Sequence, residues 1–159
     1  MVTAILRDVT ERRQAEQALA ASEQRYRGLV QTMHELVAEI TLDGVFRLVN
    51  QAFCAATGYE EAELLGTSLM SYLHDEDQSH AREDARRLRE ERRLIRNSDY
   101  RFRTKDGRYR YLVANGDPIY DAAGHLQSLV MVCFDLTERK MAEETIRRLA
   151  YYDALTGLP

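Results

Sequence analysis

The sequence has no tryptophan, only two cysteines and two prolines, and no two adjacent glycines among its 159 residues. Cys54 and Cys133 are far apart and have no CxxC or Cys–His spacing, so they predict buried, reduced thiols rather than a disulfide or a metal site. No apolar run approaches the roughly 18 residues that a membrane span needs, and the first ten residues lack a signal-peptide pattern. We expect a cytoplasmic segment without membrane contact.

Several catalytic motifs are absent as well. The chain holds no Walker-type GxxxxGK[ST], no HExxH and no GxSxG, and its spacing indicates no cluster of serine, histidine and acid. The sequence therefore predicts a segment that has no catalytic residues of its own and no metal site.

Charge is plentiful but unevenly distributed around a net value of -4. Residues 82–110 contain twelve Lys and Arg against six acids, which raises the question of a nucleic-acid surface. The alternative is a solvated helix with pairs such as Glu83 and Arg87, followed by a strand whose outer face carries Arg101 and Lys105. Because no nucleic-acid motif accompanies the charge, we favour the alternative and expect no nucleic-acid partner.

An internal repeat sets the organisation of the chain. DVTERRQAE at residues 8–16 returns as DLTERKMAE at residues 135–143, each time where an apolar, strand-like run gives way to a charged helix. The same module boundary is therefore crossed twice. The predicted parts are the remnant of an upstream module at 1–10, a linker helix at 11–33, a complete module at 24–137 and an exit helix at 138–152.

Both helices carry a heptad pattern. Thr10 and Thr137 are expected to cap them through their side-chain oxygens. Small and apolar residues then recur at steps of three and four, in the same register in both helices. Each stripe either packs on its own domain or forms a weak parallel seam in a homodimer, and we favour the seam. Its predicted residues are Ala15, Leu19, Tyr26, Leu29, Ala142, Ile146 and Leu149.

Short strands and helices fill the region between the two helices. Asp43-Gly44 predicts a hairpin, and Asn50 and Gly58 mark the start and end of a short helix. A longer helix has acids in its first turn and bases in its last. Three strands follow, and the last is apolar on both faces, which predicts a central position. The order predicts an α+β fold, a five-stranded antiparallel sheet with short helices and one long helix on one face.

Five phrases in this region resemble a known family. They are LDGVFRLVNQAF, ATGYEEAELLG, the HDED opening of the long helix, KDGRYRYLVANGDPIYDAAG and CFDLTERK. Together they resemble a PAS domain of the sensory-box type over residues 24–137, and residues 1–10 then resemble the end of an upstream PAS module.

The final phrase, YYDALTGLP, resembles the opening of a GGDEF diguanylate cyclase domain, so residues 153–159 are expected to begin one. Histidine kinases that follow PAS modules open instead with a phosphoacceptor histidine helix, and none begins here. The Gly-Gly pair of the cyclase signature is missing from the chain. The resemblance thus implies a sensory and relay module whose parent, rather than the segment, is the cyclase. The alternative is a ligand-free module for protein interaction and dimerisation.

The PAS family binds haem, flavins, small metabolites or nothing between the sheet and the long helix. GTSLMSYL lacks the cysteine of flavin photochemistry, and His80, the candidate haem ligand, lies in a strongly charged helix. Haem and flavin are therefore disfavoured, which leaves a small organic metabolite or no ligand. The candidate pocket residues are Phe53, Met70, Tyr72, Phe102, Asn115, Met131 and Cys133.

Asp135 and Thr137 are the predicted signal-relay residues. In the family, the D-x-T phrase ties the last strand to the exit helix. The physical basis expected here is a carboxylate and a hydroxyl that can bond exposed backbone groups at the junction, so that a change in sheet strain alters the helix angle. Plain helix capping is the alternative role, and the two roles are compatible.

Overall fold

The computed structural model describes residues 2–157 of the chain. Two compact units, divided between Met33 and His34, make up the described part. The first unit is a helix and the second contains the sheet.

The first unit consists of α1, Val2–Thr32. The predicted cap at Thr10 is wrong, because this residue lies inside the helix and its hydroxyl donates to the carbonyl oxygen of Leu6 at 2.8 Å. Backbone groups within a continuous helix are already bonded to the neighbouring turns, so no cap is needed there. Residues 2–10 therefore join the linker helix.

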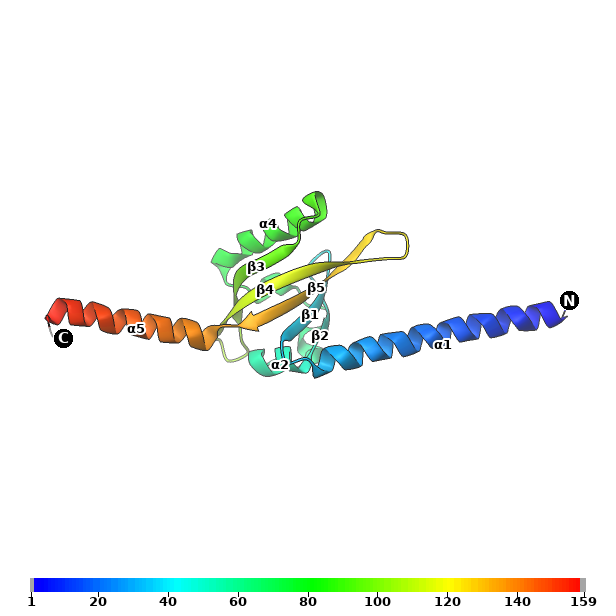
Figure 1. Ribbon diagram of the computed structural model, residues 1–159, viewed down its shortest axis with the longest axis horizontal. Coiled ribbons are helices and arrows are strands. Elements are labelled where there is room, and N and C mark those ends of the chain that lie inside the picture. The colour runs from blue at the N-terminus through cyan, green and yellow to red at the C-terminus, as the bar shows by residue number, and fades with distance from the viewer. Residues whose placement is uncertain (1, 158–159) are drawn as a thin grey trace. The chain divides into compact units, whose positions relative to one another are not determined.

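The second unit is built on a five-stranded antiparallel sheet with the strand order β2-β1-β5-β4-β3 (Figure 1). The apolar last strand lies at the centre of the sheet, as its composition predicted. The strands are β1 (Leu36–Thr41), β2 (Phe46–Val49), β3 (Ile95–Arg103), β4 (Tyr109–Tyr120) and β5 (Leu126–Asp135).

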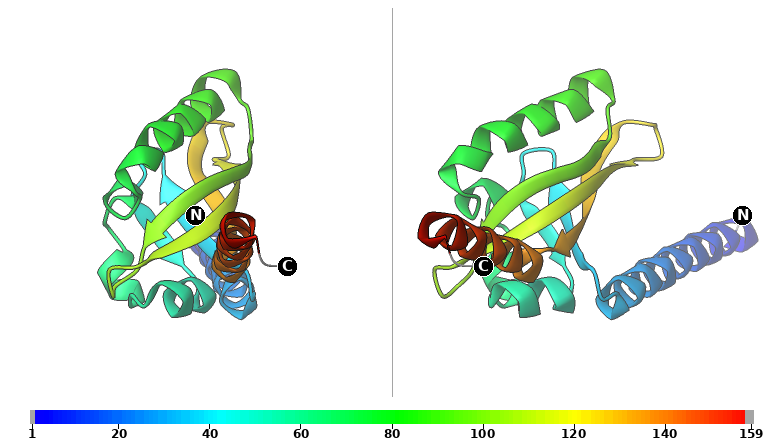
Figure 2. Two further views of the ribbon diagram at one scale, coloured as in Figure 1. Left: turned by 90° about the vertical axis from the view of Figure 1, so that its left-hand side faces the viewer. Right: turned by 60° about the vertical axis from the view of Figure 1, so that its left-hand side comes forward.

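Helices α4 and α2 lie on one side of the curved sheet, as Figure 2 shows. The α+β architecture predicted from the element order is thereby confirmed. The helical elements of this unit are α2 (Gln51–Thr57), α3 (Glu61–Leu64), the 3₁₀ turn η1 (Leu69–Ser71), α4 (Asp75–Glu91) and α5 (Thr137–Thr156).

Asn50 shows how local sequence and tertiary packing combine. Its side-chain oxygen accepts hydrogen bonds of 3.0 Å from the backbone N–H of Phe53, at the start of α2, and from that of Val37 in β1. Its amide donates to the carbonyl of Glu35 at 2.8 Å. One fully buried side chain thus caps a helix, as predicted, and also fixes that helix to the sheet.

An aromatic cluster fills the space between the sheet and the short helices. Phe46 makes edge-on contacts with Phe53 and Tyr72 at ring-centroid distances of 5.8 and 5.9 Å, and Phe53 contacts Phe102 at 5.3 Å. Such pairs add to the free energy of burial. The four rings belong to one buried core that also includes Ala81 and Leu88 of α4.

Candidate functional site: a cavity under the long helix and a strand-to-helix junction

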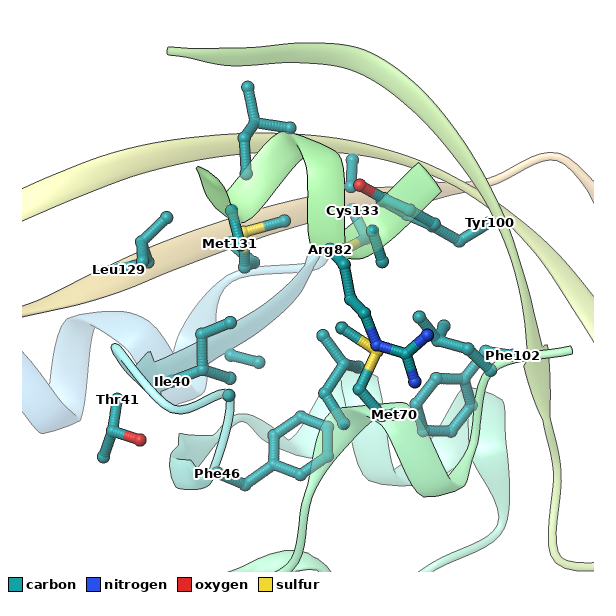
Figure 3. Close-up of a pocket in the computed structure, with 18 of the residues that line it drawn as sticks. Ile40, Thr41, Phe46, Met70, Arg82, Tyr100, Phe102, Leu129, Met131 and Cys133 are labelled. Atoms are coloured by element: carbon teal, nitrogen blue, oxygen red, sulfur yellow. The ribbon is translucent and has the colours of Figure 1, made fainter. Parts of the chain in front are cut away.

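A cavity of about 420 Å³ lies between the sheet and α4 (Figure 3). Its size falls within the range of small-molecule sites, which are mostly apolar and carry a few polar groups. Residues of β1, β3, β4 and β5 line one wall, and α4 and the turn between β1 and β2 line the opening. The deeper lining is formed by Ala38, Ile40, Phe46, Leu73, Ala81, Ile95, Leu112, Ala114 and Leu129, together with five of the predicted residues.

The five predicted residues that line the cavity are Phe53, Met70, Phe102, Met131 and Cys133. They come from α2, η1, β3 and β5, so only the folded chain brings them together. Whether they contact a ligand stays a prediction.

Tyr72 and Asn115 do not belong to the cavity lining. Tyr72 stacks on Phe102 and its hydroxyl pairs with the Thr67 hydroxyl at 2.9 Å, so it is part of the core behind the cavity. Asn115 follows Ala114, which lines the cavity, and neighbouring residues of a strand point to opposite faces. Its side-chain oxygen instead accepts from the N–H of Asn97 at 2.9 Å.

The interior of the cavity is uncharged. Burial raises the pKa of Cys133 to about 12, so this thiol stays protonated at neutral pH. Burial and a hydrogen bond of 2.6 Å to Asp84 raise the pKa of Tyr100 as well. Asp84 itself lies outside the lining and also accepts from the Ser98 hydroxyl at 2.6 Å. A ligand inside the cavity would therefore meet neutral groups.

The charged residues of the lining are Arg82 and Arg89 of α4 and Asp43 of the hairpin turn, and because all three are exposed they mark the opening of the cavity. Neither arginine was predicted from the sequence, because a strongly charged helix face is typical of a solvated surface. A usable signal was present, because the two arginines are seven residues apart and thus lie two turns apart on one helix face. Ala81 and Ala85 lie on the same face and leave space beneath it.

His80 lies outside the cavity. Its side chain is 50% exposed and its Nε2 lies 3.5 Å from Asp84 Oδ2. Among residues 2–157, no histidine lines the cavity and no cluster of His, Cys, Asp and Glu has the arrangement of a metal site. The residues at the cavity therefore do not include the histidine that was considered for haem.

Many arginines of residues 82–110 form ion pairs with neighbouring acids. Arg87 Nε lies 2.9 Å from Glu83, the pair predicted from the helical spacing. Arg86 contacts three acids, Glu83 at 2.8 Å, Glu90 at 2.7 Å and Glu91 at 3.1 Å. Much of the positive charge of residues 82–110 is thus balanced locally.

The strand-to-helix junction joins three elements. Asp135 Oδ1, at the end of β5, accepts hydrogen bonds from both the N–H (3.0 Å) and the hydroxyl of Thr137. The Thr137 hydroxyl oxygen accepts from the N–H of Tyr111 in β4 at 3.0 Å, and Tyr111 O accepts from Leu136 N–H at 2.9 Å. The start of α5 is therefore bonded to the two neighbouring strands β4 and β5.

The capping role predicted for Thr137 is wrong. Leu136 occupies the cap position without a side-chain bond, and Thr137 is the first residue of α5. The Thr137 hydroxyl oxygen accepts a hydrogen bond from Tyr111 of β4. The carboxylate of Asp135 therefore accepts the bond from the first free N–H of the helix, which is that of Thr137 itself. Arg110 lies beside this carboxylate, with its guanidinium nitrogen 3.5 Å from Asp135 Oδ2.

The predicted seam residues are exposed. In α5, residues 138–156 are all exposed, so the stripe does not pack on its own domain. Ile146 and Leu149 leave 66% and 61% of their surface open, and Leu19 and Leu29 of α1 leave 62% and 63%. Tyr26 is 39% exposed, and Ala15 and Ala142 are exposed. The dimer remains a prediction.

The chain is similar to proteins of one known family. The family model described as the PAS fold matches residues 24–136, most of the chain. The chain belongs to the PAS family. It is 34% identical over 140 residues to the two-component sensor PprA of Pseudomonas aeruginosa, an alignment that covers 87% of this chain and 15% of that protein. The chain thus spans a small part of this relative.

Two solved PAS structures share the fold. The PAS-B domain of Drosophila melanogaster Cycle with bound ethylene glycol has a TM-score of 0.59 and 22% identity, over 63% of this chain and 98% of that one. A PAS domain from Colwellia psychrerythraea has a TM-score of 0.66 and 17% identity, over 74% and 98%. Within residues 2–157, no helix has the length and apolarity that crossing a membrane requires.

Proposed function

We propose that this PAS sensory module dimerises through α1 and α5 and relays a signal to a diguanylate cyclase domain that follows it. The junction at Asp135 and Thr137 carries the proposal, because it makes the first turn of α5 part of the hydrogen-bonding network of the sheet. The segment contributes no catalytic residues, and the parent protein is the enzyme.

A change in the sheet would reach the output through the length of α5. This helix has 20 residues and extends roughly 30 Å from the junction, so a small change of angle at its base becomes a large displacement at its end. A diguanylate cyclase joins two nucleotides held by two subunits. The distance between the ends of two α5 helices is then the quantity that the signal controls.

The C-terminal phrase supports the assignment of the output. Asp153–Thr156 continue α5, and Gly157 ends the helix in the left-handed conformation, with its N–H bonded to Asp153 O at 3.0 Å. The last two residues of the phrase lie outside the described part. Because the cyclase uses cytoplasmic GTP, the proposal places the segment in the cytoplasm.

The experiment is a rate measurement of cyclic di-GMP synthesis by the full-length parent carrying Asp135→Ala. We expect the basal rate to change by about fivefold or more, the range of ordinary coupling between sites, while the circular dichroism spectrum stays unchanged. Asp121→Ala is the matched control, since Asp121 also bonds backbone N–H groups, at 2.9 Å, but at the opposite end of β5. Equal rates for wild type and Asp135→Ala would refute the relay, and absence of cyclic di-GMP would refute the output.

A second output is favoured by one observation, the similarity to a protein named as a two-component sensor. The same module and junction would then act on a phosphotransfer domain. Incubating the full-length parent with radiolabelled ATP separates the two outputs, because a two-component sensor retains the label on the protein and a diguanylate cyclase does not.

A further inference from the structure

The four arginines of α4 fall into two groups. Arg86 and Arg87 pair with acids of the same helix at 2.7 to 3.1 Å. Arg82 and Arg89, which line the cavity, have no carboxylate within ion-pair distance in the part of the chain that the structure describes. Arg82 bonds only the neutral side chain of Gln78, at 3.3 Å. The two cationic groups left without an ionic partner are thus the two at the opening.

The charge at the opening is net positive. Arg82 and Arg89 contribute two positive charges and Asp43 contributes one negative charge, which leaves an excess of one. Figure 3 shows the Arg82 side chain extending from α4 over the cavity. A guanidinium group presents a planar set of donors that matches a carboxylate.

The space below the opening suits a hydrocarbon. Its lining is dominated by aliphatic, aromatic and sulfur-containing side chains, and its two titratable groups, Tyr100 and Cys133, are neutral. A charged group would lose its hydration there without a partner. The ligand's charge must therefore stay at the opening while its body fills the interior.

We propose that the cavity binds an apolar carboxylic acid, with its carboxylate held at the opening by Arg82 and Arg89 and its hydrocarbon body enclosed between α4 and the sheet. Binding of such an acid does not depend on the output domain. Only its role as the signal rests on the proposed function.

The test is isothermal titration calorimetry of the 159-residue chain with two acids and their neutral counterparts. Decanoate, kept below its micelle threshold, is compared with decanol as a flexible pair, and naphthoate is compared with naphthol as a rigid pair. We expect at least one acid to bind about tenfold or more tightly than its alcohol, the gain expected from a charge-assisted hydrogen bond. Failure of both acids to bind, or equal affinities within both pairs, would overturn the proposal.

Two variants and one control locate the site. Arg82→Gln removes the charge at similar length and should reduce the acid's affinity about tenfold with little effect on the alcohol. Arg87→Gln removes a charge from the same helix outside the cavity and should leave both affinities unchanged. Ala85→Leu fills the cavity with a good helix former and should weaken acid and alcohol alike. An acid that binds Arg82→Gln or Ala85→Leu as tightly as wild type is bound elsewhere, which would also overturn the proposal.

Adding the bound acid to the full-length parent then distinguishes this inference from the proposed function. Loss of calorimetric binding refutes the ligand class and leaves the relay intact. Binding with an unchanged rate of cyclic di-GMP synthesis supports the ligand class and argues against its role as the signal.

Discussion

The sheet module and its two flanking helices differ in how far they bury their apolar side chains. In the module, Phe46, Phe102 and Leu64 are exposed by 2% or less. In α1 and α5, Leu19, Leu29, Ile146 and Leu149 are all more than 60% exposed. A single helix cannot bury its own apolar stripe, whereas a sheet covered by helices can. The module therefore buries its own apolar side chains, whereas those of the two helices stay exposed, and we propose that a second copy of the chain covers them.

Within α5, the first residue is buried against the sheet while the rest of the helix is exposed. Its first residue, Thr137, is buried and bonded to the sheet, but residues 138–156 are exposed. The helix is therefore held at its base and open along its length. Under the proposed function, such a helix would change its pairing with a second copy while the core stays intact, as a relay between two conformational states requires.

The largest expected effect is in the aromatic cluster. Phe46→Ala removes a ring that contacts Phe53, Tyr72 and Phe102, and should lower the free energy of unfolding by about 3–5 kcal/mol. Leu149→Ala removes an apolar side chain of α5 and should change the unfolding of the isolated monomer by no more than about 0.5 kcal/mol. Urea denaturation measures both. If both variants lowered the free energy of unfolding by similar amounts, the contrast in burial between the module and α5 would be contradicted.

An intermediate effect is expected where α4 is attached to the sheet. Asp77 accepts from the backbone N–H of Arg101 at 2.7 Å and pairs with its guanidinium at 2.7 and 3.0 Å. Asp77→Asn should lower the free energy of unfolding by about 1–2 kcal/mol at neutral pH, because hydrogen bonds to charged groups are stronger than neutral ones. Asp75→Asn, in the same helical turn but without an arginine contact, is the control.

The same bond predicts a pH dependence. Hydrogen bonding to Arg101 holds the pKa of Asp77 below its usual value of about 4, so its stabilisation is complete above that pH and is lost as the pH falls through the lower folded-state value. Thermal unfolding between neutral pH and about pH 3 should therefore show a steeper acid loss in wild type than in Asp77→Asn. Parallel curves would contradict the assignment of this carboxylate.

The smallest effect on monomer stability is expected in the predicted seam. Leu19→Lys and Ile146→Lys introduce charges on exposed faces and should alter the unfolding of the monomer by about 0.5 kcal/mol or less. If the seam forms the homodimer, the same variants should shift sedimentation equilibrium from dimer to monomer. Gln17→Lys, at an exposed polar position of α1 outside the seam register, should leave the dimer intact. A wild-type chain that sediments as a monomer would contradict the predicted dimer seam.

Local signals in the sequence were sufficient for several elements. Asp43-Gly44 predicted the hairpin between β1 and β2, where Gly44 adopts a φ of 80° that a side chain would disfavour. Asn50 was recognised as a helix cap, and the two-sided apolar pattern predicted the central position of β5. Each of these signals acts over a few residues, so no long-range contact was needed to read it.

Sequence patterns were less informative about which face of a strand or helix a given side chain occupies. Asn115 was assigned to the cavity because β4 is partly apolar on both sides, and only the pairing of β4 with its neighbours fixes which face each residue takes. A register shift between Ile95 and Ser98, with Asn97 at a φ of 51°, further changes the facing of β3. Arg82 and Arg89 were missed because a charged helix face looks solvated unless a cavity beneath it is known.

Local periodicity, turn residues and a repeated phrase were sufficient to predict the α+β element order and the two flanking helices, and the resemblance of five short phrases predicted the PAS family. Long-range contacts place the Thr137 hydroxyl against β4 rather than at the cap of α5, and they place two of the four arginines of α4 in the lining of a cavity whose interior is neutral. The physical reason is that a hydrogen bond or an unpaired charge depends on what lies across from it. That partner comes from a strand or helix distant in the chain.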